Sequence, residues 1–180
     1  MSFETHAAPL STADAQPGAK VLSSQQSARE LIARLHDVAQ MRRTGVLLLG
    51  AAWLGQEKAL CARLGAGIEA WDYARWWRES LSPHSRFLAV SPDDLLAQLA
   101  DWARDESRPA TVAVFNFDLP LAFLSSPERA RFWNDLLLRF PKTRRAILVM
   151  LPAASPLGPD DANRVLWEQT GRLQRVEMDE

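Results

Sequence analysis

Apolar residues in this chain fall into short runs, and the segments between the runs place apolar residues at every third or fourth position. Short apolar runs are typical of strands buried on both faces, as in a parallel sheet, whereas the wider spacing is typical of amphipathic helices. The predicted strands are 46–49, 68–71, 86–90, 112–117, 146–151 and 173–178. The run at 86–90 also fits the lead-in to the next helix, and the alternating last strand is expected at a sheet edge.

The predicted helices begin at recognisable capping residues. Ser27 and Glu30 have the spacing of a capping box and predict a first helix over 27–43, while Ser91-Pro92 and Ser126-Pro127 each place serine before a helix-starting proline. Further helices are predicted over 57–64, 73–78 and 161–167. The alternation of strands and helices predicts an α/β, doubly wound, mostly parallel sheet of about five or six strands with helices on both faces.

The length and composition indicate one domain without a strong electrostatic field. Of 180 residues, 21 are basic and 22 acidic, giving a formal charge of −1 that does not gather nucleic acid or an anionic membrane. We expect a flexible tail over 1–23, poor in large apolar residues, and a single α/β domain over 24–180. The one cysteine, Cys61, excludes an internal disulfide. With no signal peptide and no membrane-length apolar run, the expected location is the cytoplasm.

A glycine-framed segment follows the strand at 46–49. Gly50 and Gly55 have the spacing of the phosphate-binding loop G-x-x-x-x-G-K-[ST], whose backbone N–H groups surround a phosphate, whose lysine contacts the outer phosphates and whose hydroxyl holds Mg²⁺. Gln56 stands at the lysine position and Glu57 at the hydroxyl position. We therefore predict a loop that keeps its shape without its catalytic chemistry. A plain strand-to-helix turn is the structural alternative.

An acid follows the apolar strand at 112–117. Asp118 stands where a Walker B acid would face a metal, although it could equally cap the loop that it enters. Because the carboxyl ends of parallel strands meet at one edge, we expect the Gly50 loop, Asp118 and the loop after Leu151 to lie together. The candidate nucleotide-site residues are Gly50, Gly55, Gln56, Glu57 and Asp118. No catalytic residue, metal site or firmly bound cofactor is predicted.

The strand, glycine loop and acid resemble the P-loop NTPase family of the RecA and AAA type, with a degraded Walker A motif. The layout over roughly 31–176 is also similar to the small P-loop protein of BREX-type phage-defence systems. The resemblance implies a non-catalytic or weakly catalytic binding or regulatory subunit of a bacterial multiprotein system, and raises Mg²⁺-ATP as a cofactor that we do not expect to bind firmly. Two alternatives are an ATPase subunit with catalytic groups supplied in trans and a RecA-like accessory factor in DNA repair or recombination.

Seven tryptophans beside a single tyrosine indicate aromatic contacts with another chain as well as a core. Trp76 and Trp77 are adjacent on a predicted helix, so their side chains diverge by roughly 100° and one of them is expected to be exposed. The apolar segment 119–124 predicts either a partner surface or a short helix folded onto its own sheet. We expect self-association or a protein partner contacted by Trp77, Leu121 and Phe123, with no nucleic-acid binding by the chain alone and no membrane association.

Overall fold

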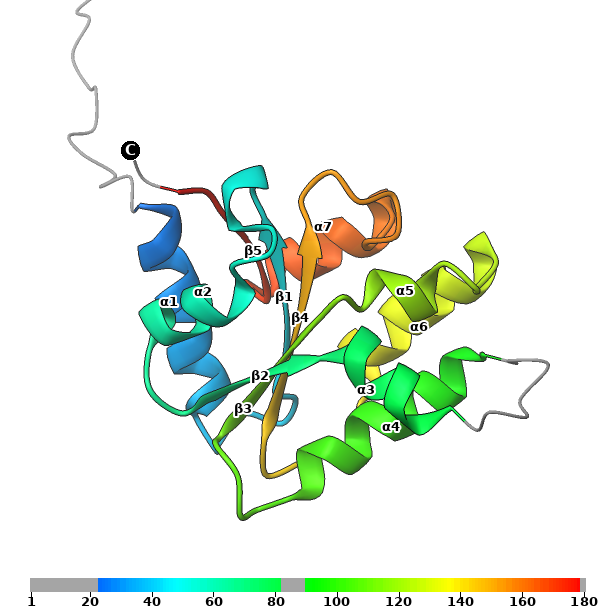
Figure 1. Cartoon of the computed structure of the whole chain (residues 1–180), viewed down its shortest axis with the longest axis horizontal. Coiled ribbons are helices and arrows are strands. Elements are labelled where there is room, and N and C mark those ends of the chain that lie inside the picture. Colours follow the sequence, from blue (N-terminus) through cyan, green and yellow to red (C-terminus); the bar gives the residue numbers. More distant parts are fainter. Residues whose placement is uncertain (1–22, 82–89, 179–180) are drawn as a thin grey trace, which may run out of the picture.

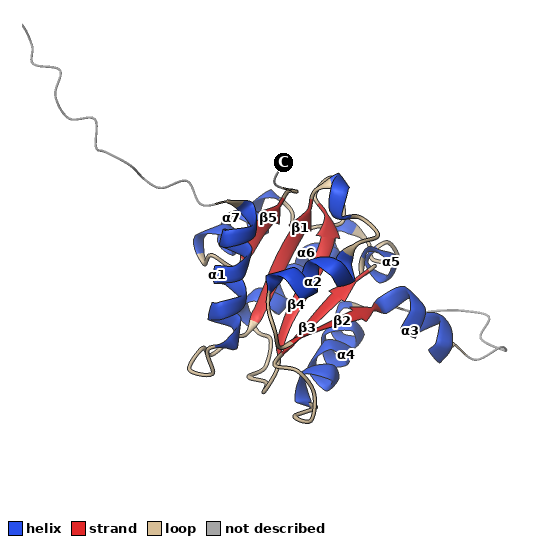
Figure 2. Ribbon diagram, turned by 60° about the vertical axis from the view of Figure 1, so that its left-hand side comes forward, coloured by secondary structure: helices blue, strands red, loops and turns tan. Residues whose placement is uncertain are grey.

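The computed structural model describes residues 23–81 and 90–178, which form a parallel sheet with helices on both faces (Figures 1 and 2). The strands are β1 (Thr44–Leu49), β2 (Ile68–Asp72), β3 (Thr111–Phe115), β4 (Ala146–Pro152) and β5 (Leu173–Val176). The helices are α1 (Ser24–His36), the 3-10 helix η1 (Ala51–Trp53), α2 (Glu57–Leu64), α3 (Tyr73–Ser80), α4 (Pro92–Arg104), α5 (Asp118–Leu121), α6 (Ser126–Leu138) and α7 (Asp161–Gln169). The strand order is β2-β3-β4-β1-β5, and the predicted α/β class is confirmed.

Two sequence predictions fall mostly outside the described residues. These are the tail over 1–23 and the strand over 86–90, of which Val90 alone in the second run is described and is not in a strand. The other five predicted strands are present, with bounds that differ by one or two residues. Strand β3 ends at Phe115 and not at the predicted Phe117, so the chain turns at Asn116 before it reaches Asp118.

Alternate side chains of each strand enter two different cores. Val46 and Leu48 of β1 face the core under α4, α6 and α7, whereas Leu47 and Leu49 face the core under α1 and α2. Strands β3 and β4 divide their residues in the same way. Figure 1 shows α1 and α2 on one side of the sheet and α4 and α6 on the other. Both faces of the central strands are therefore buried, which explains why their sequences are continuously apolar.

Strands β1 and β4 are neighbours in the sheet, and the connections that leave them run in opposite directions across it. From β1 the chain passes through α2, on one face, to β2 at one edge, and it then returns through helices on the opposite face to β5 at the other edge. Right-handed connections require this change of face, because the two directions of travel place their helices on opposite sides. The loops after β1 and β4 consequently diverge, and doubly wound proteins bind ligands in the crevice at such a point.

Helix α1 is shifted from the predicted range 27–43. Its cap is Ser23 and it ends at His36. The capping-box spacing that starts at Ser27 lies inside the helix, because several neighbouring serines offer equivalent caps. Val38 belongs to the predicted apolar face and is nevertheless 74% exposed. Extending the helix to this residue would bury no further apolar surface, so the sequence pattern overstated its length.

Arginines hold the amino-terminal ends of three strands, at the edge of the sheet opposite the glycine loop. Arg43 and Arg145 are buried, Arg172 is half-buried, and all three donate to backbone carbonyl oxygens. The Arg172 guanidinium also lies 5.0 Å from the ring centroid of Trp167. Burial, with a smaller effect of Arg42, lowers the pKa of Arg172 to about 10. These guanidinium groups are occupied within the fold and are not free to contact phosphates.

Candidate functional site

The predicted glycine loop forms the turn from β1 to α2, and both of its glycines have a structural cause. A Cβ atom on Gly50 would lie 3.2 Å from the Val176 carbonyl oxygen, which is a tight contact with the backbone, whereas the exposed Glu177 carboxylate that it would also meet can move aside. Gly55 has a φ of 79°, which glycine adopts without the steric cost that other residues pay. The path of the chain therefore explains the glycine spacing without a bound phosphate.

Four successive backbone N–H groups of this loop, those of residues 53–56, already have acceptors within the chain. Those of Trp53, Leu54 and Gln56 donate to carbonyl oxygens of the same loop, at 3.0 to 3.3 Å. The Gly55 N–H donates to Oε1 of Glu57 at 2.9 Å. In a phosphate-binding loop such N–H groups point at the anion. Here the carboxylate of the chain's own Glu57 takes a position that a phosphate oxygen would need.

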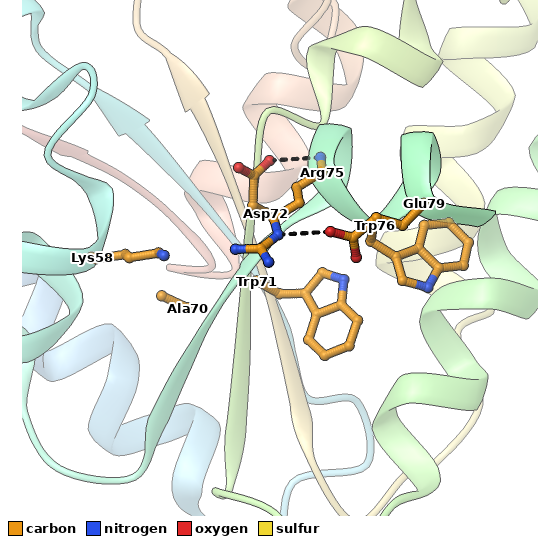
Figure 3. A pocket seen from close by; sticks show the side chains of 7 residues that line it. All are labelled: Lys58, Ala70, Trp71, Asp72, Arg75, Trp76 and Glu79. Atoms are coloured by element: carbon orange, nitrogen blue, oxygen red, sulfur yellow. Dashed lines mark hydrogen bonds and ion pairs between the residues drawn. The ribbon is translucent and has the colours of Figure 1, made fainter. Parts of the chain in front are cut away.

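The loop does not gain a cation from its neighbours in sequence. Gln56, at the lysine position of the motif, is exposed and makes no capping hydrogen bond with its side chain. Lys58 lines a separate hollow beside β2, together with Arg75 and Glu79 (Figure 3). Successive helical residues diverge by roughly 100°, which explains why Lys58 points away from the loop. This orientation agrees with the loss of the lysine contact predicted from the motif.

Asp118 reaches the carboxyl edge of the sheet through a turn. After Phe115 ends β3, Asn116 adopts a φ of 55°, a left-handed conformation that asparagine tolerates better than most residues. The Asn116 amide donates to Oδ1 of Asp72 at 2.9 Å and so connects the ends of β3 and β2. Asp118 is half-buried in the first turn of α5, where the positive end of the helix favours a carboxylate.

A cavity of about 200 Å³ lies at the crevice where the ends of β1, β3 and β4 meet. It is lined by Leu49, Leu54, Gly55, Glu57, Phe115, Asn116, Asp118, Met150 and Pro152. The structure thus brings Gly55, Glu57 and Asp118 together at the predicted edge and leaves Gly50 and Gln56 out of the lining.

The charges of this cavity oppose those that a nucleotide needs. Within residues 23–81 and 90–178, its charged lining consists of the carboxylates of Glu57 and Asp118. Phosphoryl groups are held by lysine, by backbone N–H groups and by a metal bound to a hydroxyl. Two carboxylates facing an apolar wall instead repel phosphate, and the small volume leaves little room for a nucleotide.

The predicted partner contacts differ in their accessibility. Leu121 is fully buried, so its assignment as a partner contact is wrong: α5 is a short helix folded onto its own core. Phe123 is 55% exposed and packs edge-to-face on Trp77, with ring centroids 5.5 Å apart. Trp76 and Trp77 are both half-buried, so neither is the exposed tryptophan that the sequence predicted. Phe123 and Trp77 together form an accessible aromatic pair.

Neither the protein-family models nor the curated proteins contain a match to this chain. In the described part of the chain, no helix has the length and apolar character to cross a membrane, and no three His, Cys, Asp or Glu side chains gather as a metal site. The class of protein is therefore defined by its geometry: an α/β protein with a five-stranded parallel sheet, consistent with a doubly wound P-loop-like fold.

The structure also predicts that Cys61, on the helix that follows the loop, makes the folded protein less stable at alkaline pH. Burial, with a smaller effect of Glu57, raises the pKa of this thiol to about 12 from 9.0. Above about pH 9 the unfolded chain loses the thiol proton while the folded chain keeps it. The contribution of this group to the free energy of unfolding is therefore fully present below pH 9 and falls as the pH rises above it. Between pH 8 and 10 we expect a loss of about 1.4 kcal/mol from this group.

Urea unfolding at both pH values checks this expectation, with Cys61→Ala as the reference. The variant should lack the additional alkaline loss, although it retains the effect of Tyr73, whose pKa burial also raises to about 12. An equal change of unfolding free energy in both proteins would contradict the assignment to Cys61.

Proposed function

We propose that this protein is a binding or regulatory subunit of a bacterial multiprotein system, built on a P-loop-like core that does not turn over nucleotide. The observation that carries the proposal is the Gly55 N–H bound to the Glu57 carboxylate, beside a cavity whose charged lining is acidic. A working P-loop ATPase needs the opposite: free N–H groups, a lysine and a hydroxyl on Mg²⁺.

The expected energetic effect on nucleotide binding is large. A lost charge-assisted contact is worth about 1.5–3 kcal/mol, which is on the order of a tenfold to a hundredfold change in affinity. Glu57 adds to this loss, because its carboxylate both occupies the Gly55 N–H and repels phosphate. With nucleotide binding weakened in these two ways, we propose that the fold serves to present a binding surface to a partner.

The aromatic pair of Trp77 and Phe123 supports the binding role. Phe123 is exposed and Trp77 is half-buried, and each is ordered by packing on the other. Aromatic side chains that are already ordered lose little entropy on association, and aromatic anchors commonly dominate interface energies. The pair lies between α3 and the end of α5, two elements that reach it from different parts of the chain. We propose that this pair contacts either a second copy of the chain or a partner protein of the same system.

Replacing either aromatic residue should weaken association while the fold is kept. For Trp77→Ala or Phe123→Ala we expect about a thirtyfold rise in dissociation constant, equivalent to about 2 kcal/mol. Val165→Ala is the control, because Val165 is also an exposed apolar residue, 50% accessible, on α7. Sedimentation of the purified protein, and copurification with the products of neighbouring genes, provide the readout. A wild-type protein that stays monomeric at high concentration and copurifies with nothing would contradict this binding role.

A further inference from the structure

Strand β2 is an edge of the sheet, and a hollow runs along its free side. β2 pairs with β3 on one side and with no described strand on the other. The hollow has a volume of about 310 Å³ and is lined by Lys58 of α2, by Ala70, Trp71 and Asp72 of β2, and by α3 (Figure 3). Successive strand residues point to opposite faces. A hollow that touches three of them in succession therefore follows the backbone edge, between α2 on one side and α3 on the other.

The backbone of Ala70 presents an unpaired donor and acceptor to this hollow. The Thr111 N–H donates to the Gly67 carbonyl at 3.0 Å, so the polar groups of residue 67 face β3. Orientation alternates along a strand in a parallel pair, and Glu69 and Trp71 consequently face β3 while the N–H and C=O of Ala70 face outward. Neither group has a hydrogen-bond partner among the described residues. An added strand would satisfy both.

The side chains around the hollow indicate the chemistry of that strand. The Asp72 carboxylate accepts hydrogen bonds from the backbone N–H of Arg75 and from Asn116. Arg75 in turn pairs with Glu79 at 2.9 Å. Lys58 and Asp72 form no ion pair with any described residue, but the Asp72 carboxylate is satisfied by its two N–H donors. The Lys58 ammonium is the charged group of this hollow that has no polar contact with a described residue. Trp76 supplies an apolar wall. The arrangement is complementary to an acidic residue next to an apolar one.

We propose that the free edge of β2 binds an extended segment of a partner protein by strand addition, with an acidic side chain of the segment on Lys58 and an apolar one against Trp76. Main-chain hydrogen bonds to Ala70 supply affinity, and the two flanking contacts supply selectivity. A second copy of this chain is disfavoured as the occupant. Antiparallel pairing of two β2 strands about Ala70 would bring both Lys58 ammonium groups to one face near the axis, where like charges repel.

This inference rests on the proposed binding function and uses a surface separate from Trp77 and Phe123. The probe is a displayed library of random eight-residue peptides, selected on the full-length protein. Selected peptides should be enriched in an acidic residue adjacent to an apolar one. Their binding, measured by fluorescence anisotropy, should slow deuterium exchange of the Ala70 amide.

Two variants test the site from different directions. Ala70→Pro removes the outward N–H without removing a bond to β3, and proline is tolerated at such edge positions. Lys58→Glu reverses an exposed charge and leaves the backbone intact. Each should weaken peptide binding at least tenfold. The control is Arg175→Pro on β5, the opposite edge, where alternation from the bonded Arg172 and Val176 carbonyls also points the N–H outward.

The outcomes separate this inference from the proposed function. Failure to select any peptide, or selected peptides that bind Ala70→Pro and Lys58→Glu as tightly as wild type, would overturn the strand-addition site. Dimerisation that Ala70→Pro abolishes would also overturn it, in favour of a second copy. If the wild-type protein binds no peptide but still associates through Trp77 and Phe123, the strand-addition site is overturned and the proposed binding function stands.

Discussion

Replacing Arg145 by methionine is expected to lower the free energy of unfolding by about 3 kcal/mol. The Arg145 side chain is 3% exposed and pairs with Glu69. It also donates to the carbonyl oxygens of Pro109 and Trp102, at 2.7 and 2.8 Å. The variant leaves these buried acceptors without their donor and keeps only Arg108 near the Glu69 carboxylate. Urea unfolding measures the loss.

The neighbouring Arg144 provides the matched control. Its side chain is 75% exposed and pairs with Glu106 at 3.2 Å. Arg144→Met should change the unfolding free energy by no more than about 0.5 kcal/mol, because exposed pairs contribute little. Equal effects of the two substitutions would show that burial of Arg145 does not determine its role. Because Glu69 belongs to β2, the Arg145→Met variant should also increase deuterium exchange in that strand.

Truncation of Trp133 to alanine should cost about 3–5 kcal/mol of unfolding free energy. Trp133 is fully buried and packs against Phe132 and Trp167, with ring centroids 5.1 and 6.2 Å away. Its Nε1 donates to the Leu157 carbonyl at 3.0 Å. The substitution would remove contacts that join helices α6 and α7 in one core and would leave a cavity there.

Trp133→Phe separates the apolar contribution from the hydrogen bond. Phenylalanine keeps much of the ring contact but leaves the Leu157 carbonyl without its donor, so we expect a loss of about 1–2 kcal/mol. Urea unfolding of both variants gives the comparison. If alanine and phenylalanine destabilise the protein equally, the ring contacts do not carry the energy assigned to them.

The strands were predictable because burial on both faces leaves a continuous apolar run, as at β1 and β4. Helix caps were predictable where a serine or an aspartate directly precedes the helix. Ser91 and Asp160 are examples, and their side chains accept hydrogen bonds from backbone N–H groups of the first turn. The ends of α1 and β3 were not predictable. They depend on whether Val38 finds a core and on how Asn116 turns the chain, and tertiary packing decides both.

The location of the candidate site was also predictable, since parallel strands bring Gly55 and Asp118 to one edge. Its internal contacts were not, because the hydrogen bond from Gly55 to Glu57 depends on the path of a turn. The pair of Asn116 and Asp72 joins residues on different strands, and no local pattern indicates it. The accessibility of Leu121 and Phe123 likewise followed from the fold of α5, since sequence spacing alone does not tell which side of a short helix is buried.

Calorimetric titration with Mg²⁺-ATP tests the central claim most directly. With Gln56 and Glu57 in place of the lysine and hydroxyl, and with the Gly55 N–H already occupied, the wild-type protein should show no binding tighter than high micromolar and no hydrolysis. The variant Asp118→Ala should leave this result unchanged. Submicromolar binding, or ATP turnover that Asp118→Ala abolishes, would contradict the account and favour an ATPase whose missing groups come from elsewhere.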